Sequence, residues 1–254
     1  MAHPGQKAFL VVGHPGHELC VHHWLEVARP SIFVLTDGSG AVGSSRLGDT
    51  RSCATAAGAA IGASLTPRPD RDWYRSLLEN DRSLAVAAAR AILHEARVQE
   101  PQLIVSDARD GYNPMHDMAC GLAGAVCERL RREGRRVEHL VFQVEGSDPE
   151  RAAMRSLQLD EAALARKIAA ARAYRPLGEA VAARLADPGF DPTRECLFDP
   201  TAEPEAWQPM YEVIGRERVA AGRYPRAIEY ARDVRPALLA LREALEDDAW
   251  LEAS

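Results

Sequence analysis

The chain has 254 residues and a mass of 27.7 kDa, which suits one large domain or two small ones and excludes a disordered tether. Hydrophobic residues make up 46% of the sequence and charged residues 27%, as in ordinary soluble globular proteins. The net charge of −6 excludes a general electrostatic attraction to nucleic acid or to anionic lipid.

Neither a membrane segment nor a secretion signal is apparent in the sequence. No apolar run approaches the roughly 18 residues that a membrane helix needs, and the N-terminal segment lacks the longer apolar region and the cleavage site of a signal peptide. The five cysteines contain no C-x-x-C pair, so neither a disulfide framework nor a thiolate zinc site is indicated. We therefore expect a cytoplasmic protein with reduced thiols and with no membrane or nucleic-acid partner.

Strands and helices alternate over the first part of the chain. Four short apolar runs predict strands that are buried on both faces, at residues 8–12, 31–35, 102–106 and 138–144. Helix-like stretches lie at about 17–29, 46–62, 80–97 and 116–133. This order is typical of a mainly parallel sheet with helices on both sides. We therefore predict an α/β fold, a Rossmann-like three-layer sandwich with its core in residues 1–146.

Residues 147–254 predict a helical extension of the same single domain, 1–254. Asp148-Pro-Glu150 is a good helix start, and an Ala/Arg-rich helical segment follows to about residue 185. Five prolines predict a long irregular loop at 187–209, which we expect to border the pocket together with Tyr211 and Glu212. A last helix is predicted at about 225–249.

Two segments carry residues that are typical of a metal site. Gly13-His14-Pro15-Gly16-His17-Glu18 directly follows the first strand, and residues 107–117, which include His116 and Asp117, follow the third. Open α/β sheets bind their ligands at the carboxyl ends of the strands. Two imidazoles and one carboxylate could hold a catalytic zinc with an open water position, or a non-haem iron(II).

Two other motifs carry less weight. His17, Glu18 and His22 resemble the zincin H-E-x-x-H, but a spacing of five residues puts the two imidazoles roughly 140° apart on a helix. Residues 38–43 match the G-x-G-x-x-G of dinucleotide sites, but they follow the second strand instead of opening the fold. A flexible loop beside the site explains them better.

Two single residues could contact a ligand. Asp37 ends the second strand and could hold a ligand or orient a histidine, although an Asp-Gly turn needs no function to explain it. Arg51, early in the next helix, could clamp a hydroxyl or a phosphate. A solvated helix arginine is the simpler explanation for it.

The order of these motifs resembles that of the LmbE/PIG-L family, which contains zinc-dependent N-deacetylases of N-acetylglucosaminyl conjugates. The resemblance rests on a strand followed by H-P-x-x-E, a strand that ends in Thr36-Asp37-Gly38, Arg51, and Gly111-Tyr112 before a His/Asp pair. It covers about the first 145 residues and extends loosely to 167–174 and 211–219.

The resemblance implies a set of metal ligands. The family's first motif reads A-H-P-D-D-E, in which the His and the second Asp bind zinc and the first Asp is the general base. In this chain Gly16 stands at the base position and His17 at the second ligand position. The family's second motif, G-Y-G-H-P-D-H-R-A, puts the third ligand at Asp117. We therefore expect Zn²⁺, or another divalent ion such as Fe²⁺, on His14, His17 and Asp117; a slip of one residue would make His116 the ligand.

The resemblance also implies catalytic and substrate-binding roles. Because Gly16 has no side chain, proton transfer would depend on His116 or Glu18. Tyr112 matches a position that polarises the substrate carbonyl, and Arg51 matches the family's sugar-contacting arginine. We expect a metal-dependent amide hydrolase that acts on an amino sugar or a related small metabolite. A catalytically silent binding protein and a non-hydrolytic metalloenzyme with a 2-His-1-carboxylate site are the alternatives, and the oligomeric state stays open.

Overall fold

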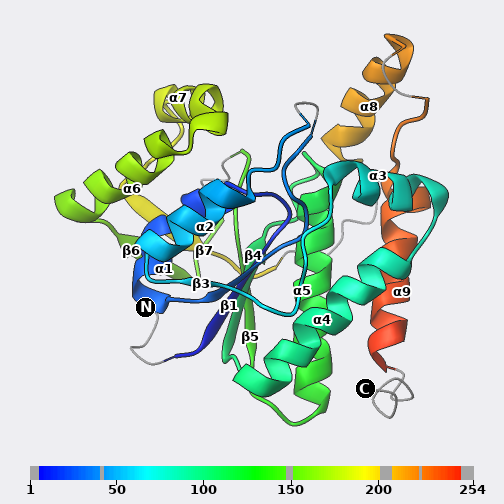
Figure 1. Cartoon of the computed structure of the whole chain (residues 1–254), viewed down its shortest axis with the longest axis horizontal. Coiled ribbons are helices and arrows are strands. Elements are labelled where there is room, and N and C mark those ends of the chain that lie inside the picture. Colours follow the sequence, from blue (N-terminus) through cyan, green and yellow to red (C-terminus); the bar gives the residue numbers. More distant parts are fainter. Residues whose placement is uncertain (1–5, 41–42, 147–150, 201–207, 223–224, 247–254) are drawn as a thin grey trace.

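Five parallel strands form the central sheet, in the order β3-β2-β1-β4-β5 (Figure 1). The strands are Ala8–Val12 (β1), Ser31–Val34 (β2), Ala60–Ile61 (β3), Leu103–Asp107 (β4) and Glu138–Phe142 (β5). This computed structural model describes residues 6–40, 43–146, 151–200, 208–222 and 225–246. Four of the strands lie at the predicted apolar runs, so the predicted α/β fold with a mainly parallel sheet is confirmed.

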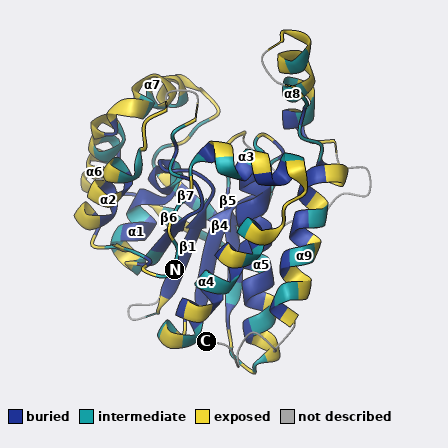
Figure 2. Ribbon diagram, turned by 45° about the vertical axis from the view of Figure 1, so that its right-hand side comes forward, coloured by how far each residue is buried: buried dark blue, intermediate teal, exposed yellow. Residues whose placement is uncertain are grey.

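Helices cover both faces of the sheet and complete three layers (Figure 1). One layer contains η1 (His17–Val21), α1 (His22–Ala28) and α2 (Leu47–Ala56), and the other contains α3 (Asp70–Glu79), α4 (Ser83–Gln99), α5 (Pro114–Arg132) and α9 (Arg235–Glu246). In β1, Phe9 and Val11 pack against the second layer, whereas Leu10 and Val12 pack against the first. Successive residues of a strand point to opposite faces, so these all-apolar strands are buried on both sides (Figure 2).

The C-terminal part combines helices with a small second sheet. Strands β6 (Arg155–Gln158) and β7 (Arg194–Leu197) pair in antiparallel fashion. Between them in the chain lie α6 (Glu161–Ala173), η2 (Arg175–Leu177) and α7 (Gly178–Ala186). A further helix, α8 (Met210–Ala220), and a π-helical turn, η3 (Tyr230–Val234), precede α9. The described residues of this part are therefore largely helical.

The two strands of the extension correct the prediction in detail. Residues 155–158 lie in a segment predicted as helix, and residues 194–197 lie in the segment predicted as an irregular loop. Phe198, directly after β7, exchanges backbone hydrogen bonds of 2.8 and 2.9 Å with Val141 of β5. Pairing with distant strands thus satisfies backbone groups in a segment whose prolines predicted no regular structure. The predicted helix start at 148–150 lies outside the described residues.

Two further differences lie between β2 and α4. The helix predicted at 46–62 ends at Ala56, because Gly58 adopts a φ of 74° and the chain then enters β3. A helix that was not predicted, α3, fills the gap before α4. Its Trp73 is buried, and the indole N–H donates to the carbonyl oxygen of Leu35 at 2.8 Å. The tertiary packing of Trp73 therefore stabilises a helix that the local sequence pattern did not predict.

A buried ion pair joins the extension to the first helical layer. The Glu195 carboxylate in β7 accepts a hydrogen bond from the Lys167 ammonium at 2.8 Å. It also accepts hydrogen bonds from the backbone N–H groups of His23 and Trp24, at 2.9 and 2.8 Å. Lys167 also donates to the carbonyl oxygen of Cys20 at 3.1 Å. Losing one member of a buried pair leaves an uncompensated charge, which is strongly destabilising. The pair therefore fixes the segment from η1 to α1 against the extension.

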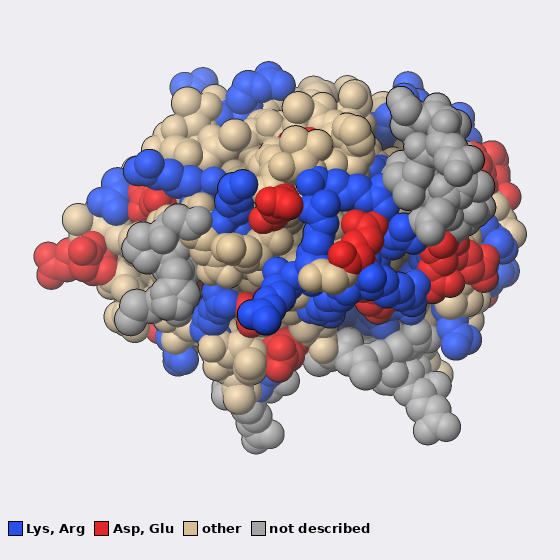
Figure 3. Space-filling view, turned by 90° about the horizontal axis from the view of Figure 1, so that it is seen from below, with Lys and Arg blue, Asp and Glu red and all other residues tan. Residues whose placement is uncertain are grey.

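The face at the amino ends of the strands is rich in arginines, and acidic side chains lie among them (Figure 3). Glu133 at the end of α5 accepts hydrogen bonds from Arg97 and Arg129, and Arg155 pairs with Glu138. Cations at the last turn of a helix also face the negative end of its dipole. These arginines are therefore largely neutralised within the fold. Within the described ranges, no helix combines the length and the apolar composition required to span a bilayer.

A buried histidine predicts an acid-sensitive fold. His139 in β5 is buried, with Nε2 2.9 Å from Ser106 Oγ, and burial lowers the pKa of His139 to about 4. An unfolded histidine titrates near pH 6.5, so the unfolded chain binds the extra proton between about pH 6.5 and 4, and stability falls as the pH decreases through this window. Between pH 7 and 5, the wild type should lose about 2 kcal/mol more unfolding free energy than His139→Gln does.

Urea denaturation at both pH values measures this difference. His94→Gln is the matched control, because His94 is exposed on α4 and its substitution should leave the pH dependence unchanged. Equal losses in wild type and His139→Gln would contradict the prediction.

Candidate metal centre

The loop after β1 holds His14 and His17 at the carboxyl edge of the sheet. Gly16 turns the chain with a φ of 107°, and His17 begins η1. The N–H of Gly13 donates to Asp107 Oδ2 at 2.8 Å. A Cβ on Gly13 would lie only 2.8 Å from the carbonyl oxygen of Met115 in α5, so only glycine fits there. The loop is thus fastened to both β4 and α5.

A third imidazole, that of His116, comes from the first turn of α5. Pro114 occupies the start of this helix, and the Asn113 side chain caps it by accepting the N–H of Met115 at 2.9 Å. The cap and the proline fix where α5 begins. They therefore fix the direction in which His116 leaves the helix, toward the loop after β1.

The rings of His14, His17 and His116 surround one small region. Their centroids are separated by 5.3 Å (His14–His17), 4.7 Å (His17–His116) and 6.1 Å (His14–His116), and the rings stand nearly perpendicular to one another. An ion bound by three imidazole nitrogens at about 2.1 Å would set tetrahedrally arranged ring centroids roughly 5 Å apart. The three rings therefore have a spacing that fits one shared ion.

Each of these rings has a carboxylate beside its Nδ1. The Nδ1–oxygen distances are 2.9 Å for His14–Asp70, 2.8 Å for His17–Asp107 and 2.7 Å for His116–Asp110. Metal-binding histidines commonly donate one ring N–H to a carboxylate, which fixes the tautomer and leaves the other nitrogen for the ion. In the described part of the chain, Nε2 of His14 is buried without a hydrogen-bond partner, as this arrangement requires.

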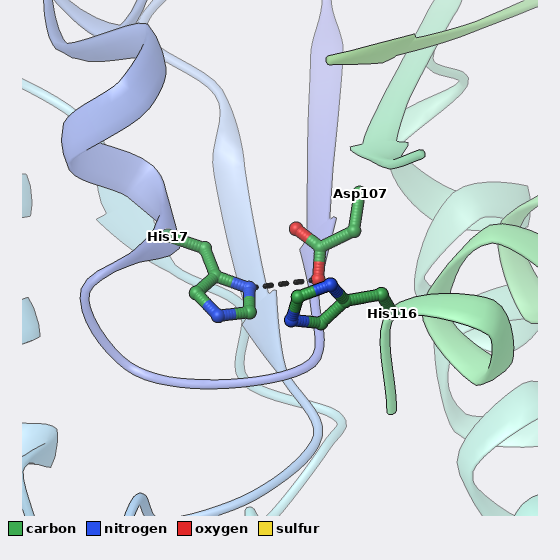
Figure 4. Close-up of side chains that lie close together, drawn as sticks. All are labelled: His17, Asp107 and His116. Carbon is green, nitrogen blue, oxygen red and sulfur yellow. Dashed lines mark hydrogen bonds and ion pairs between the residues drawn. The ribbon is translucent and has the colours of Figure 1, made fainter. Parts of the chain in front are cut away.

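Asp107 could itself bind the ion. One potential ligand atom from each of His17, Asp107 and His116 lies within 4.8 Å of the other two (Figure 4). Asp107 is fully buried at the end of β4, and its Oδ1 has no hydrogen-bond partner among the described residues. A His-Asp-His cluster that could hold a metal ion is therefore present, and His14 adjoins it.

The protonation states suit a cation. Burial lowers the pKa of His17 to about 4, so this ring is neutral at pH 7. Burial by itself would raise the pKa of Asp107, but the interactions with His17 and His116 and the N–H of Gly13 lower it on balance. For His116, burial lowers the pKa, and the hydrogen bond and charge of Asp110 outweigh this and raise it. A bound ion would compete with the proton on that ring.

Asp117, the third ligand implied by the family motif, is not a member of the His-Asp-His cluster. Its carboxylate accepts the N–H of Gly111 at 3.4 Å and the hydroxyl of Tyr211 at 3.3 Å. Burial raises the pKa of Asp117 to about 7. Successive residues of a helix point about 100° apart, so only one of His116 and Asp117 can face the cluster, and that residue is His116.

The structure thus brings together a set of residues that differs from the predicted one. It places His14 and His17 together, as expected, and adds His116 and Asp107 to them. Asp107 was not among the predicted ligands. The signal that could have found it is its position as the last residue of a strand that ends beside the loop of His14.

The other predicted site residues are more widely spread. Glu18 is fully buried and accepts the N–H of Gly16 at 2.7 Å, and burial raises the pKa of Glu18 to about 7. Tyr112 is 45% exposed, and its ring stacks at 6.4 Å from the ring of His116, so it lies beside the cluster. Asp37 accepts the N–H of Ser39 in the turn after β2. Arg51 is exposed in α2.

Side chains of the extension lie against Gly16, the position at which the family motif has an aspartate. A Cβ on Gly16 would lie 2.2 Å from Leu177 Cδ1 and 3.7 Å from Tyr174 Cζ. The Tyr174 hydroxyl lies 2.9 Å from Thr50 Oγ1, which fixes the tyrosine against α2. A side chain at position 16 would therefore require the Leu177 side chain to move, and the positive φ of Gly16 would strain its backbone. Residues 187–209, Tyr211 and Glu212 were expected to border the pocket. Of these, Tyr211 contacts Asp117, and residues 201–207 lie outside the described part of the chain.

Single substitutions should show whether His116 or Asp117 is the third metal ligand. We expect His14→Ala, His17→Ala and His116→Ala each to reduce bound zinc well below one ion per chain, whereas Asp117→Asn retains it. Elemental analysis after dialysis against zinc gives the metal content. His94→Ala should bind as much zinc as the wild type, because His94 is exposed on α4. Loss of zinc in Asp117→Asn with retention in His116→Ala would restore the set implied by the family motif.

The packing around Gly16 predicts a large loss of stability for Gly16→Ala. The new Cβ would meet Leu177 at a position with positive φ, so overpacking adds to backbone strain. We expect about 2 kcal/mol or more of destabilisation by urea denaturation. Gly134→Ala is the control, because Gly134 also has a positive φ, of 79°, but open space around it. Equal effects of both substitutions would show that the contact with Leu177 contributes nothing.

Comparison with solved structures gives a distant match. The conserved protein TT1542 from Thermus thermophilus matches with a TM-score of 0.48 and 18% sequence identity, over 80% of this chain and 99% of that chain. No protein-family model matches the sequence, and no curated protein matches it. The function proposed below therefore depends on the geometry of the site and on the sequence motifs.

Proposed function

We propose that the protein is a metal-dependent hydrolase that cleaves the amide bond of an acylated amino sugar or a related small metabolite. The observation that carries this proposal is the group of three imidazoles, each with a carboxylate at Nδ1, at the carboxyl edge of a parallel sheet. The resemblance of the motifs to those of the LmbE/PIG-L deacetylases supports the same reaction class.

The donor set is compatible with two ions. Three neutral imidazoles with an open fourth position suit Zn²⁺, whereas His17, His116 and Asp107 form a 2-His-1-carboxylate set that also suits Fe²⁺. A bound divalent ion would polarise the acyl carbonyl and lower the pKa of a coordinated water toward about 7. The carboxylates of Asp70 and Asp110 would keep the imidazoles of His14 and His116 oriented.

Proton transfer requires a group other than residue 16. His116 lies among the imidazoles that would bind the ion, and the Glu18 carboxylate is held by the N–H of Gly16. Asp107 lies in the cluster and has one oxygen without a hydrogen-bond partner in the described part of the chain. Where the three imidazoles hold the ion and Asp107 is not a ligand, we therefore assign the general base to Asp107 in place of His116 or Glu18. Tyr112, half-exposed beside His116, would donate its hydroxyl to the substrate carbonyl.

Two alternatives each have an observation in their favour. Leu177 fills the space next to Gly16 where the family's base would stand, which favours a catalytically silent binding protein. The presence of Asp107 beside His17 and His116 favours a non-hydrolytic iron(II) enzyme. The ion and the product formed distinguish these alternatives from the hydrolase.

Hydrolysis of a panel of N-acetylated amino sugars tests the proposal. Protein loaded with Zn²⁺ or Fe²⁺ should release acetate, and His17→Ala should lower kcat/KM by about 100-fold or more. Asp107→Asn should lower kcat by a similar factor even where this variant retains its metal. Glu18→Gln should retain most of the wild-type kcat. His94→Ala is again the control.

The opposite outcomes are equally specific. A fully metal-loaded wild type that binds members of the panel without turnover would indicate the binding protein. Turnover with iron that yields no free acetate would indicate the non-hydrolytic enzyme.

A further inference from the structure

Arg46 precedes α2, and the fold fixes its backbone. Its N–H donates to the carbonyl oxygen of Asp37 at 2.8 Å. Its carbonyl oxygen accepts the N–H groups of Asp49 and Thr50, at 3.1 and 3.3 Å, and the hydroxyl of Tyr174 at 3.3 Å. The side chain therefore begins from a point tied to the end of β2, to α2 and to the extension.

The guanidinium of Arg46 lies over the loops that carry the imidazoles. A Cβ on Gly38 would lie 2.6 Å from Nε and 3.0 Å from Nη2 of Arg46, and 3.0 Å from Cδ of Pro15. Pro15 follows His14, and the N–H of Gly38 donates to Thr36 Oγ1, which in turn lies 2.9 Å from Nδ1 of His14. Gly38, with a φ of 70°, thus makes room for a cation on the His14 side of the cluster.

The charge of Arg46 is not compensated within the fold. Its Nε is buried without a hydrogen-bond partner, and no carboxylate among the described residues pairs with it. The nearby carboxylates have other partners, because Asp70 is held by His14 and Asp37 Oδ1 accepts the N–H of Ser39. Arg226, by comparison, pairs with Asp233 at 2.9 Å. An unpaired buried donor on a fixed cation requires an explanation.

We propose that Arg46 binds an anionic group of the substrate, a carboxylate or a phosphate, beside the imidazole cluster. The planar guanidinium donates to either oxyanion in a bidentate manner, and partial burial strengthens the interaction. This inference rests on the proposed function, because it takes the cluster as the place where the substrate is held. It narrows the substrate to an N-acyl amino compound that carries a negative charge close to its acyl group.

Calorimetric titration of the full chain tests the assignment with three probes. N-acetylglucosamine is neutral, N-acetylglucosamine 1-phosphate carries a phosphate next to the acylated amine, and N-acetylmuramic acid carries a carboxylate next to it on the other side. At least one anionic probe should bind the wild type about 10-fold or more tightly than the neutral sugar. Arg46→Gln should abolish this preference, and Arg46→Lys should restore part of it. Titrations of both zinc-loaded and chelator-treated protein separate binding by Arg46 from binding of the anion to the metal.

Arg71→Gln is the matched control, because Arg71 is an exposed arginine of α3 and its loss changes the net charge equally. It should keep the preference of the wild type. The assignment is overturned if Arg46→Gln keeps the preference too, or if neither anionic probe binds more tightly than the neutral sugar. Binding that depends on Arg46 without any acetate release would support this assignment while contradicting the hydrolase. Release of acetate with no dependence of binding on Arg46 would do the reverse.

Discussion

The buried carboxylate of Asp107 is the interaction on which the candidate metal centre depends. One of its oxygens accepts the N–H of Gly13 and lies 2.8 Å from Nδ1 of His17, so a single group at the end of β4 holds both the loop after β1 and a ring carried by that loop. Burial of a carboxylate is costly unless its oxygens are paired. The fold therefore gains stability from the same contact that orients a candidate ligand.

The imidazoles of His14 and His116 follow the same principle. Each donates toward a carboxylate from a different element, Asp70 at the start of α3 or Asp110 in the loop before α5. A group of three imidazoles with carboxylates behind them attracts a cation. Arg46 adds a positive charge at the border of this region, so a ligand there meets both an ion site and an anion site.

The C-terminal extension takes part in the site and does more than cover the sheet. Leu177 and Tyr174 fill the space beside Gly16, and the Tyr211 hydroxyl donates to Asp117. The ion pair of Lys167 and Glu195 keeps this part of the chain in place. Residues 16 and 117 are thus both packed against side chains that the extension supplies.

The sequence by itself determined the α/β order, four of the five strands of the central sheet and the convergence of two histidine-bearing segments at one edge. These follow from local patterns, since apolar runs predict buried strands and parallel strands present their carboxyl ends together. Only the tertiary structure showed that His116, and not Asp117, belongs to the His-Asp-His cluster, because this depends on where the cap of Asn113 starts α5. The tertiary structure also decided three other features. These are the contact of His14 with Asp70, the pairing of β6 with β7 and the packing of Leu177 against Gly16. These contacts join residues far apart in the chain, and no local pattern encodes them.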